Sequence, residues 1–295
     1  MELISSHGTL AGDLPIEFLS QVDSLPAVAK EVARQNPQAQ TMFVSNLQTQ
    51  GSARMGRLWQ SASGCFHVVM IVRPQVPMPY FNGLSILCSL AVLDVFEQLG
   101  LTDIAPKWPN DFTHNGKKLG SVFVDAGYAD GMFALCGVHL NLTRDPASPN
   151  ELAKRIASTY DGTPHPFEPA FLGDCLEDCR VARDDAHSTS ADINATLDIR
   201  RLAELLYQAL AARVSAWEDA IQQKKSLAGP IALFLHEYYD RMDLLGAKVQ
   251  ALAPDGRVQQ TGILAGLDVW GRITLLDEKG AEHEFAPEQT SIRAL

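Results

Sequence analysis

The chain has 295 residues and a formal net charge of −11 at pH 7, with 46% hydrophobic and 20% charged residues. These proportions are typical of a folded globular protein and exclude a largely disordered chain. The acidic balance argues against nonspecific nucleic-acid binding. There is no run of eighteen apolar residues, so we expect no membrane span.

The cysteines and the N-terminus indicate where the chain works. Five widely spread cysteines are typical of reduced thiols inside a cell. Cys175 and Cys179 are four residues apart, but no second Cys or His pair stands at ligand spacing, so we expect no metal site built from protein side chains. The first residues, 1–7, lack the basic region and apolar stretch of a signal peptide. We therefore expect a location in the cytoplasm or an organellar matrix.

The first hundred residues alternate strand-like and helix-like patterns. Ser24 is a plausible N-cap, and Pro26 suits the first turn of the following helix. Apolar residues recur at helical spacing before Gly100, a residue type that commonly ends helices. The elements expected here are strands over 16–22, 40–46 and 65–72 and helices over 27–34 and 80–99.

A lysine stands at the start of a predicted hairpin. Lys107 precedes Trp108-Pro109, and the proline disfavours helix at the tryptophan. Turn residues follow at 110–111 and 114–116, and a strand-like run begins after them. We therefore expect Lys107 to be fixed on a rigid β-hairpin, although an ordinary solvated lysine has the same local pattern.

Beyond the hairpin, the sequence predicts a strand followed by helices, and after about residue 245 a series of short strands. The expected elements are a strand over 132–142, helices over 151–159, 169–177, 199–223 and 229–240, and a polar surface insertion over 180–194. From about residue 245 short strands recur, as in a small β-barrel; they are expected over 248–252, 258–265, 272–276 and 281–285. A barrel this small should pack on the main domain, so we expect domains at 1–240 and 241–295.

Three stretches resemble the signatures of the biotin protein ligase family. The loop 48–59 is similar to its glycine- and arginine-rich loop, and 137–141 is similar to its Gly-x-Gly-x-Asn strand. Residues 107–120 match its Lys-Trp-Pro-Asn-Asp…Gly-Lys-Lys-Leu-x-Gly hairpin, the most specific of the three. The end of the chain resembles the family's C-terminal domain. The resemblance implies an α+β fold, a class II synthetase-like mixed β-sheet packed with helices, plus a C-terminal SH3-like β-barrel.

The resemblance also implies a two-step ligase reaction. Biotin and Mg-ATP would form biotinyl-5'-AMP, and a lysine of a biotin carboxyl carrier domain would then accept the biotin. Two unit charges 4 Å apart repel by about 4 kcal/mol at an effective dielectric near 20. Fixed cations would offset that repulsion between carboxylate and phosphate. The expected enzyme is monofunctional, binds neither nucleic acid nor membrane, and forms a possible homodimer.

The resemblance assigns roles to individual residues. Lys107 and Arg54 would be catalytic, Asn141 and Arg293 would contact the nucleotide, and magnesium would arrive with ATP rather than on a protein cluster. The histidines show no pairing in the sequence and receive no role. The residues expected to bind biotin or its adenylate are Ser24, Gln48, Gly51, Ser52, Arg54, Trp59, Lys107 and Gly137.

The chain also departs from the family pattern. Leu25 and Pro26 replace a threonine and an asparagine, Ser52 replaces an arginine, and His139 replaces the second glycine of Gly-x-Gly. Losing one charge-assisted hydrogen bond costs about 1.5–3 kcal/mol. Two other functions therefore stay open. One is lipoate or octanoate ligation, although the Arg-Arg-x-x-Gly-Gly-Gly loop of those enzymes is absent; the other is a non-catalytic biotin- or adenylate-binding module.

Overall fold

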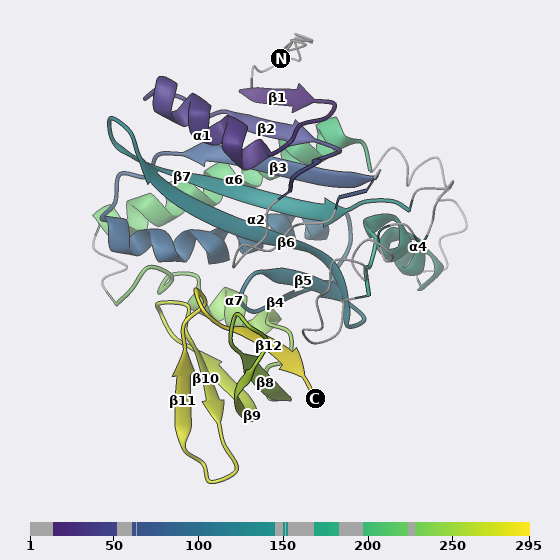
Figure 1. Cartoon of the computed structure of the whole chain (residues 1–295), viewed down its shortest axis with the longest axis vertical. Coiled ribbons are helices and arrows are strands. Elements are labelled where there is room, and N and C mark those ends of the chain that lie inside the picture. The colour runs from purple at the N-terminus through teal and green to yellow at the C-terminus, as the bar shows by residue number, and fades with distance from the viewer. Residues whose placement is uncertain are drawn as a thin grey trace.

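The computed structural model describes residues 14–51, 61–62, 64–144, 150, 152, 168–182, 197–223 and 228–295 (Figure 1). Two β-sheets and several helices make up this part of the chain. Their bounds are β1 Ile16–Leu19, α1 Leu25–Gln35, β2 Met42–Ser45, β3 Cys65–Val72, η2 Met78–Gly83, α2 Leu84–Gln98, β4 Ala105–Lys107, β5 Asp111–His114, β6 Lys117–Tyr128, β7 Met132–Asn141, α4 Leu172–Ala182, α6 Ile199–Gln222, α7 Leu235–Arg241, β8 Lys248–Leu252, β9 Val258–Leu267, β10 Ile273–Leu276, β11 Glu282–Phe285 and β12 Ser291–Ala294.

The larger sheet is mixed, as expected from the sequence. Its seven strands run in the order β1-β2-β3-β7-β6-β5-β4. Only the pair β1 and β2 is parallel among these described strands, and the other neighbours are antiparallel. The hairpins from β4 to β7 therefore place the Lys107 segment at one edge of the sheet.

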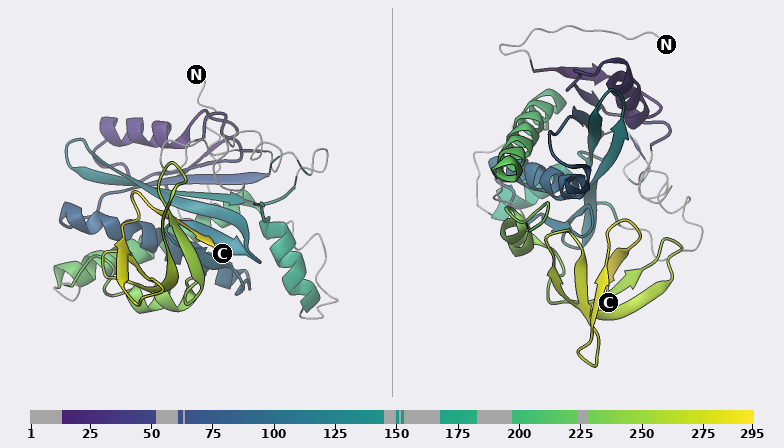
Figure 2. Two further views of the ribbon diagram at one scale, coloured as in Figure 1. Left: turned by 60° about the horizontal axis from the view of Figure 1, so that its bottom comes forward. Right: turned by 90° about the vertical axis from the view of Figure 1, so that its left-hand side faces the viewer.

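Helices cover both faces of this sheet (Figure 2). On one face α1 buries Leu25, Ala29 and Ala33, whose spacing of four residues forms an apolar stripe. On the other face α2 packs against the sheet and against α6. Because both faces are covered, all eight residues of β3 are buried, which explains why its sequence is apolar except at His67.

Helix α2 is apolar on nearly every side. The stretch Met78–Gln98 is long and apolar enough to cross a membrane by composition alone, but 72% of its most apolar window is buried in the protein. A helix inside a protein core needs the same composition. Its burial here is that of a core helix.

The second sheet is antiparallel and contains five strands, in the order β11-β10-β9-β8-β12. Its inner residues, among them Val249 and Leu264, belong to the same hydrophobic core as α2 and α6. Trp108 Nε1 also donates a hydrogen bond of 2.9 Å to the Gly271 carbonyl. The C-terminal sheet thus packs on the rest of the molecule, as its small size requires; the boundary at 240/241 stays a prediction.

Three expected helices have different bounds. Helix α2 begins at Leu84 rather than at 80, because a 3₁₀ segment containing Pro79 precedes it and a proline removes an amide donor. Helix α7 begins at Leu235, since the Ile231 amide donates to Val269 instead of continuing a helix backwards. Helix α4 begins at Leu172, because residues 168–170 pair with Lys118 as an extended segment.

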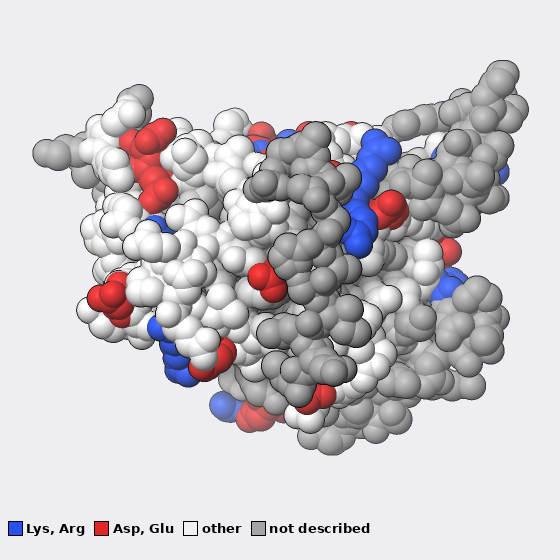
Figure 3. Space-filling model, turned by 90° about the horizontal axis from the view of Figure 1, so that it is seen from above, with Lys and Arg blue, Asp and Glu red and all other residues white. Residues whose placement is uncertain are grey.

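Some expectations lie outside the described residues. Of the helix expected over 151–159 only Leu152, a buried helical residue, is described. Residues 180–182 of the expected insertion form the end of α4, which corrects the start of that insertion, and the remainder to 194 lies outside. Acidic and basic side chains lie among one another on the described part of the face above β1 and α1 (Figure 3). The charge on this part of the surface is mixed in sign.

Candidate active site

A row of polar side chains crosses the large sheet. Residues paired on neighbouring strands direct their side chains to the same face. Six residues that are paired from strand to strand form this row, and we call them the polar row: Lys107, Asp111, Ser121, His139, His67 and Ser45. They lie on the face of the sheet that α1 covers. Five of them are buried, and Asp111 is partly exposed.

Lys107 lies at the β4 end of the polar row. Its side chain is confirmed on the expected hairpin but is not solvated, because the residue is only 9% exposed. Burial lowers the pKa of the Lys107 ammonium, and the carboxylates of Asp111 and Asp243 act against that shift. Asp111 is also held by Lys118, with Nζ 2.7 Å from Oδ1. The site therefore places a cation in a low-dielectric environment beside a fixed carboxylate.

Two buried histidines meet in the middle of the polar row. Nδ1 of His67 lies 2.8 Å from Nδ1 of His139, and Nε2 of His67 lies 2.8 Å from Oγ of Ser61. Burial lowers the pKa of His67 to about 3 and also lowers that of His139. Both rings are thus neutral near pH 7, and a hydrogen bond joins the two facing Nδ1 atoms, one as donor and the other as acceptor. The expectation that the histidines are unpaired is wrong.

Gly137 allows a close approach, but to a protein ring. A Cβ placed on Gly137 would fall 1.8 Å from Cε1 of Phe123, whose ring occupies that space. The same ring stacks on His139, with centroids 5.2 Å apart and planes at 26°. In this structure the surface of β7 beside Gly137 is therefore covered by Phe123, and the expected contact of Gly137 with biotin stays a prediction.

Gln48 and its neighbours lie where the first loop meets α1. Oε1 of Gln48 accepts a hydrogen bond from the Leu25 backbone amide at 2.8 Å, and the Gln48 backbone amide donates to Ser61 Oγ at 3.3 Å. Ser24 occupies the expected N-cap position, but its side chain makes no capping hydrogen bond. Gly51 is buried at the end of the described part of this loop. Ser61 thus links Gln48 to His67 and the polar row.

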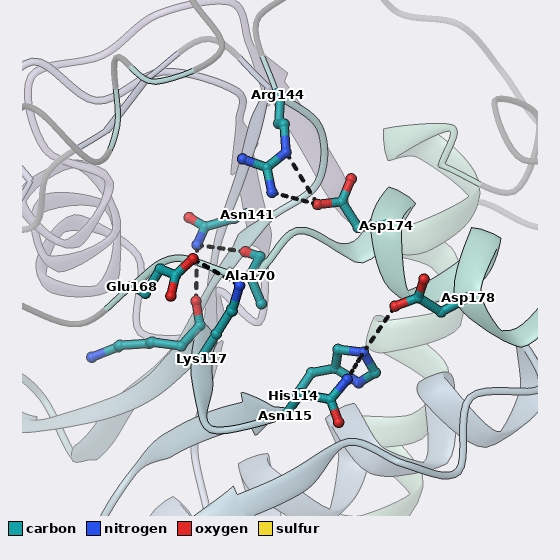
Figure 4. A network of polar contacts seen from close by, with 10 residues as sticks. His114, Asn115, Lys117, Asn141, Arg144, Glu168, Ala170, Asp174 and Asp178 are labelled. Carbon is teal, nitrogen blue, oxygen red and sulfur yellow. Dashed lines mark hydrogen bonds and ion pairs between the residues drawn. The ribbon is translucent and has the colours of Figure 1, made fainter.

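Asn141 belongs to a polar network at the end of β7 (Figure 4). Its Nδ2 donates to the carbonyls of Lys118, at 3.3 Å, and Ala170, at 3.1 Å. These bonds tie β7 to β6 and to the segment before α4. The side-chain amide therefore has a structural role. Its expected contact with the nucleotide stays a prediction.

The remaining candidates lie elsewhere. The Arg293 guanidinium donates to Gln250 on the neighbouring strand β8, so its proposed reach to the nucleotide also stays a prediction. Ser52, Arg54 and Trp59 lie outside the described residues. The structure therefore brings Lys107 onto the same sheet face as Gly137, while Gln48 joins that face through Ser61 and His67.

Sequence reasoning assigned no role to four residues of this site, Asp111, Ser121, Phe123 and His67, and noted His139 only as a departure from the family pattern. A signal was present, because His67 interrupts an apolar strand and His139 stands two residues from Gly137 on the same face. The register that pairs β3 with β7 could not be predicted from the sequence.

Cys175 of α4 is not an activated thiol. Burial and three neighbouring aspartates raise the pKa of Cys175 to about 12, so its thiol stays protonated. In the part of the chain that the structure describes, no group of three His, Cys, Asp or Glu residues is arranged to hold a metal ion.

Comparison with known proteins shows which family the chain resembles. The model of the biotin/lipoate A/B protein ligase family matches residues 19–141. The chain is 30% identical over 168 residues to the biotin–[acetyl-CoA-carboxylase] ligase of Paracoccus denitrificans, covering 54% of this chain and 68% of that one. It is also 30% identical over 142 residues to the bifunctional ligase/repressor BirA of Bacillus subtilis, covering 47% and 43% respectively.

A solved structure shares the whole fold. The biotin protein ligase from Aquifex aeolicus in complex with biotin and ATP superposes with a TM-score of 0.60 at 18% identity, over 95% of this chain and 99% of that one. The mixed sheet and the C-terminal sheet thus define the biotin/lipoate ligase class of fold. Within that class, the chain belongs to the biotin protein ligase family. The matched segment covers 43% of the length of the Bacillus subtilis relative.

Proposed function

We propose that the chain is an ATP-dependent biotin protein ligase. In the first step an oxygen of the biotin carboxylate attacks the α-phosphorus of ATP, and the bond to pyrophosphate breaks. In the second step the amine of a carrier lysine attacks the acyl carbon, the bond to AMP breaks and the amine loses a proton. The observation that supports this most is the buried Lys107 in its Lys-Trp-Pro-Asn-Asp corner.

Lys107 would act through its charge rather than as a nucleophile. Its ammonium lies out of bulk water, where a fixed charge interacts more strongly with developing negative charge. Lys118 forms an ion pair with Asp111, the residue that pairs with Lys107 across the hairpin, so a second cation lies near Lys107. We propose that these groups orient and neutralise the carboxylate and the α-phosphate. Magnesium would arrive bound to ATP as part of that substrate.

The partner proposed for the second step is the biotin carboxyl carrier domain of a biotin-dependent carboxylase. The name of the Paracoccus relative, a biotin–[acetyl-CoA-carboxylase] ligase, supports this partner. The net charge of −11 supports a protein that works without nucleic acid. We propose the cytoplasm as its location, where such carboxylases and reduced thiols coexist.

Isotope exchange between ATP and pyrophosphate tests the first step. The purified chain should catalyse exchange that depends on biotin, and it should then label an isolated carrier domain with radiolabelled biotin. Exchange without labelling would overturn the carrier partner. A folded protein with no acid-dependent exchange would instead support a non-catalytic binding module.

A second candidate function is lipoate or octanoate ligation. The observation that favours it is the ring of Phe123, which covers the surface beside Gly137 and leaves less room for a fused ring system. Radiolabelled biotin, lipoate and octanoate, each supplied with its own carrier domain, would separate the two functions by which label is transferred.

A further inference from the structure

Asp243 connects the last third of the chain to the hairpin that carries Lys107. It lies in the segment between α7 and β8, and α7 contacts β4 (Figure 1). The backbone amide of Asp243 donates to the carbonyl of Pro106, on β4, at 2.9 Å. Its Oδ2 accepts a hydrogen bond from Thr113 Oγ1, on β5, at 2.6 Å. Asp243 therefore binds both strands of the hairpin, including the residue that directly precedes Lys107.

The carboxylate of Asp243 is held at both oxygens. Its Oδ1 accepts the amide of Leu244 at 2.9 Å, while Oδ2 accepts the hydroxyl of Thr113. Leu244 has a φ of 65°, in the left-handed region that a bulky side chain rarely adopts. Such a conformation persists where the surrounding contacts fix it, and the side chain of Leu244 packs against the hydrophobic core. The fold thus determines the position of the carboxylate.

Three charged groups of the described residues act on the buried ammonium of Lys107. Burial lowers its pKa, Asp111 and Asp243 raise it, and Lys118 lowers it. Asp111 is also paired with Lys118, whose Nζ lies 2.7 Å from its Oδ1, so the charge of Asp243 is a separate contribution. The hydroxyl of Tyr238, on α7, interacts with Asp111; burial and that carboxylate raise its pKa, so it stays neutral. Asp243 thus supports the protonated form of Lys107.

We propose that Asp243 is a positioning residue for acid activation: it fixes the hairpin through Pro106 and Thr113 and keeps Lys107 a cation. The proposal rests on the ligase function proposed above and deepens it, because it gives the segment before the C-terminal sheet a part in the site. In this role Asp243 acts through Lys107 rather than by contact with the substrate. A misplacement of about 1 Å can cost about 10²-fold in rate, so the fixed hairpin matters as well as the charge.

The pH dependence of biotin-dependent ATP–pyrophosphate exchange tests the charge of Asp243. Exchange should fall at alkaline pH as Lys107 loses its proton. Asp243→Asn keeps the shape and an acceptor oxygen but removes the charge that raises the pKa of Lys107, so this fall should begin at lower pH. The ratio of kcat/KM at pH 7 to that at pH 9.5 should therefore exceed the wild-type ratio by about threefold or more. Asp243→Glu retains the charge and should keep a ratio near that of the wild type.

Thr113→Val tests the anchoring separately from the charge. It removes the hydroxyl but retains the carboxylate of Asp243, so kcat/KM at pH 7 should fall about threefold or more while the pH ratio stays unchanged. An unchanged kcat/KM in this variant would overturn the anchoring role. Asp243→Ser serves as a second neutral variant, and circular dichroism verifies that each protein is folded.

Asp240→Asn is the matched control. Asp240 is an exposed residue of α7 that pairs with His236 at 3.4 Å, so its replacement changes the net charge equally and should leave the pH ratio unchanged. A wild-type pH ratio in folded, active Asp243→Asn and Asp243→Ser would overturn this proposal even if the rate fell, because a purely structural role lowers the rate without moving the pH dependence. Absence of biotin-dependent exchange in the wild type would instead overturn the proposed function, and this proposal with it.

Discussion

Lys107 shows how one residue depends on its surroundings. A lysine ammonium is strongly hydrated, and removing it from water is unfavourable unless carboxylates compensate. Asp111 and Asp243 supply that compensation, while Lys118 acts against it. The protein thus keeps a buried charge that its stability does not need, which is typical of a functional site.

Replacing this lysine separates activity from stability. Lys107→Met keeps most of the side-chain volume and removes the charge, so biotin-dependent exchange should fall by about 10² or more, as when an electrostatic stabiliser is lost. The free energy of unfolding should change little, because a desolvated charge is removed as well. Lys117→Met, which removes an exposed lysine paired with Glu168, is the control. Exchange within a few-fold of wild type would show that Lys107 has no catalytic role.

His67 makes stability depend on pH in a defined window. Its pKa is about 3 in the folded protein against 6.5 for an unperturbed histidine, so between those values the unfolded chain binds a proton that the folded chain does not. The free energy of unfolding should therefore fall as pH is lowered through this window, by about 1.4 kcal/mol per pH unit for one such group. Above pH 6.5 this contribution is constant.

Urea unfolding between pH 4.5 and 7.5 measures this slope. His67→Gln should be less stable at pH 7, since Ser61 and His139 lose their partner, but should show a shallower decline toward acid. His236→Gln removes an exposed imidazole and should keep the wild-type slope. Equal slopes for the wild type and His67→Gln would contradict the role of His67.

At the scale of elements, one arginine holds three helices together. Arg213 of α6 donates to Asp94 of α2, with Nε 2.7 Å from Oδ2, and to Glu237 of α7, with Nη1 2.7 Å from Oε2. The planar guanidinium can bind two carboxylates at once, which a lysine cannot. Hydrogen bonding to Arg213 also lowers the pKa of Glu237. This cluster fixes the layer behind the large sheet.

Arg213→Met should destabilise the protein by about 2 kcal/mol, because two partly buried carboxylates lose their shared cation while remaining partly exposed. Arg213→Lys should fall between wild type and Arg213→Met, since it keeps the charge without the fork. Chemical denaturation at pH 7 measures both. Equal stability of the lysine variant and the wild type would show that charge alone, and not the bidentate geometry, holds the helices.

At the scale of the molecule, the C-terminal sheet adjoins the hairpin that carries Lys107. Trp108, the residue after Lys107, is buried and donates to the Gly271 carbonyl in the turn before β10. The Pro106 carbonyl, just before Lys107, accepts the Asp243 amide near the end of α7. The two residues that flank Lys107 are therefore bonded to the last third of the chain.

Trp108→Phe should lower the free energy of unfolding by about 1 kcal/mol through loss of this hydrogen bond. The thermal midpoint should fall by about 2 °C, as expected for a protein of this size. Trp270→Phe, at a tryptophan whose ring lies 6.3 Å from Tyr80, tests another indole of the same junction. Calorimetry of the three proteins measures the difference. An unchanged midpoint in Trp108→Phe alone would contradict the importance of this bond.

Much of the fold could be predicted from local sequence. The bounds of β3 and the turn glycines at positions 100 and 116 follow from apolar runs and from residues with positive φ, which are local properties. The family resemblance and the importance of Lys107 also rest on contiguous residues. The helix starts at 80, 169 and 229 were wrong, because proline or bonds to distant carbonyls replaced the local ladder.

The sequence by itself determined the C-terminal strands and the hairpin that carries Lys107, because both follow from periodicity, turn residues and a contiguous motif; the mixed sheet followed from the family resemblance of such motifs. Only the tertiary structure decided that Lys107 is buried, that His67 and His139 hydrogen-bond through their Nδ1 atoms, and that Phe123 fills the space beside Gly137. Those facts depend on strand register and on contacts between segments far apart in the chain. Local sequence does not specify which residues meet across a sheet.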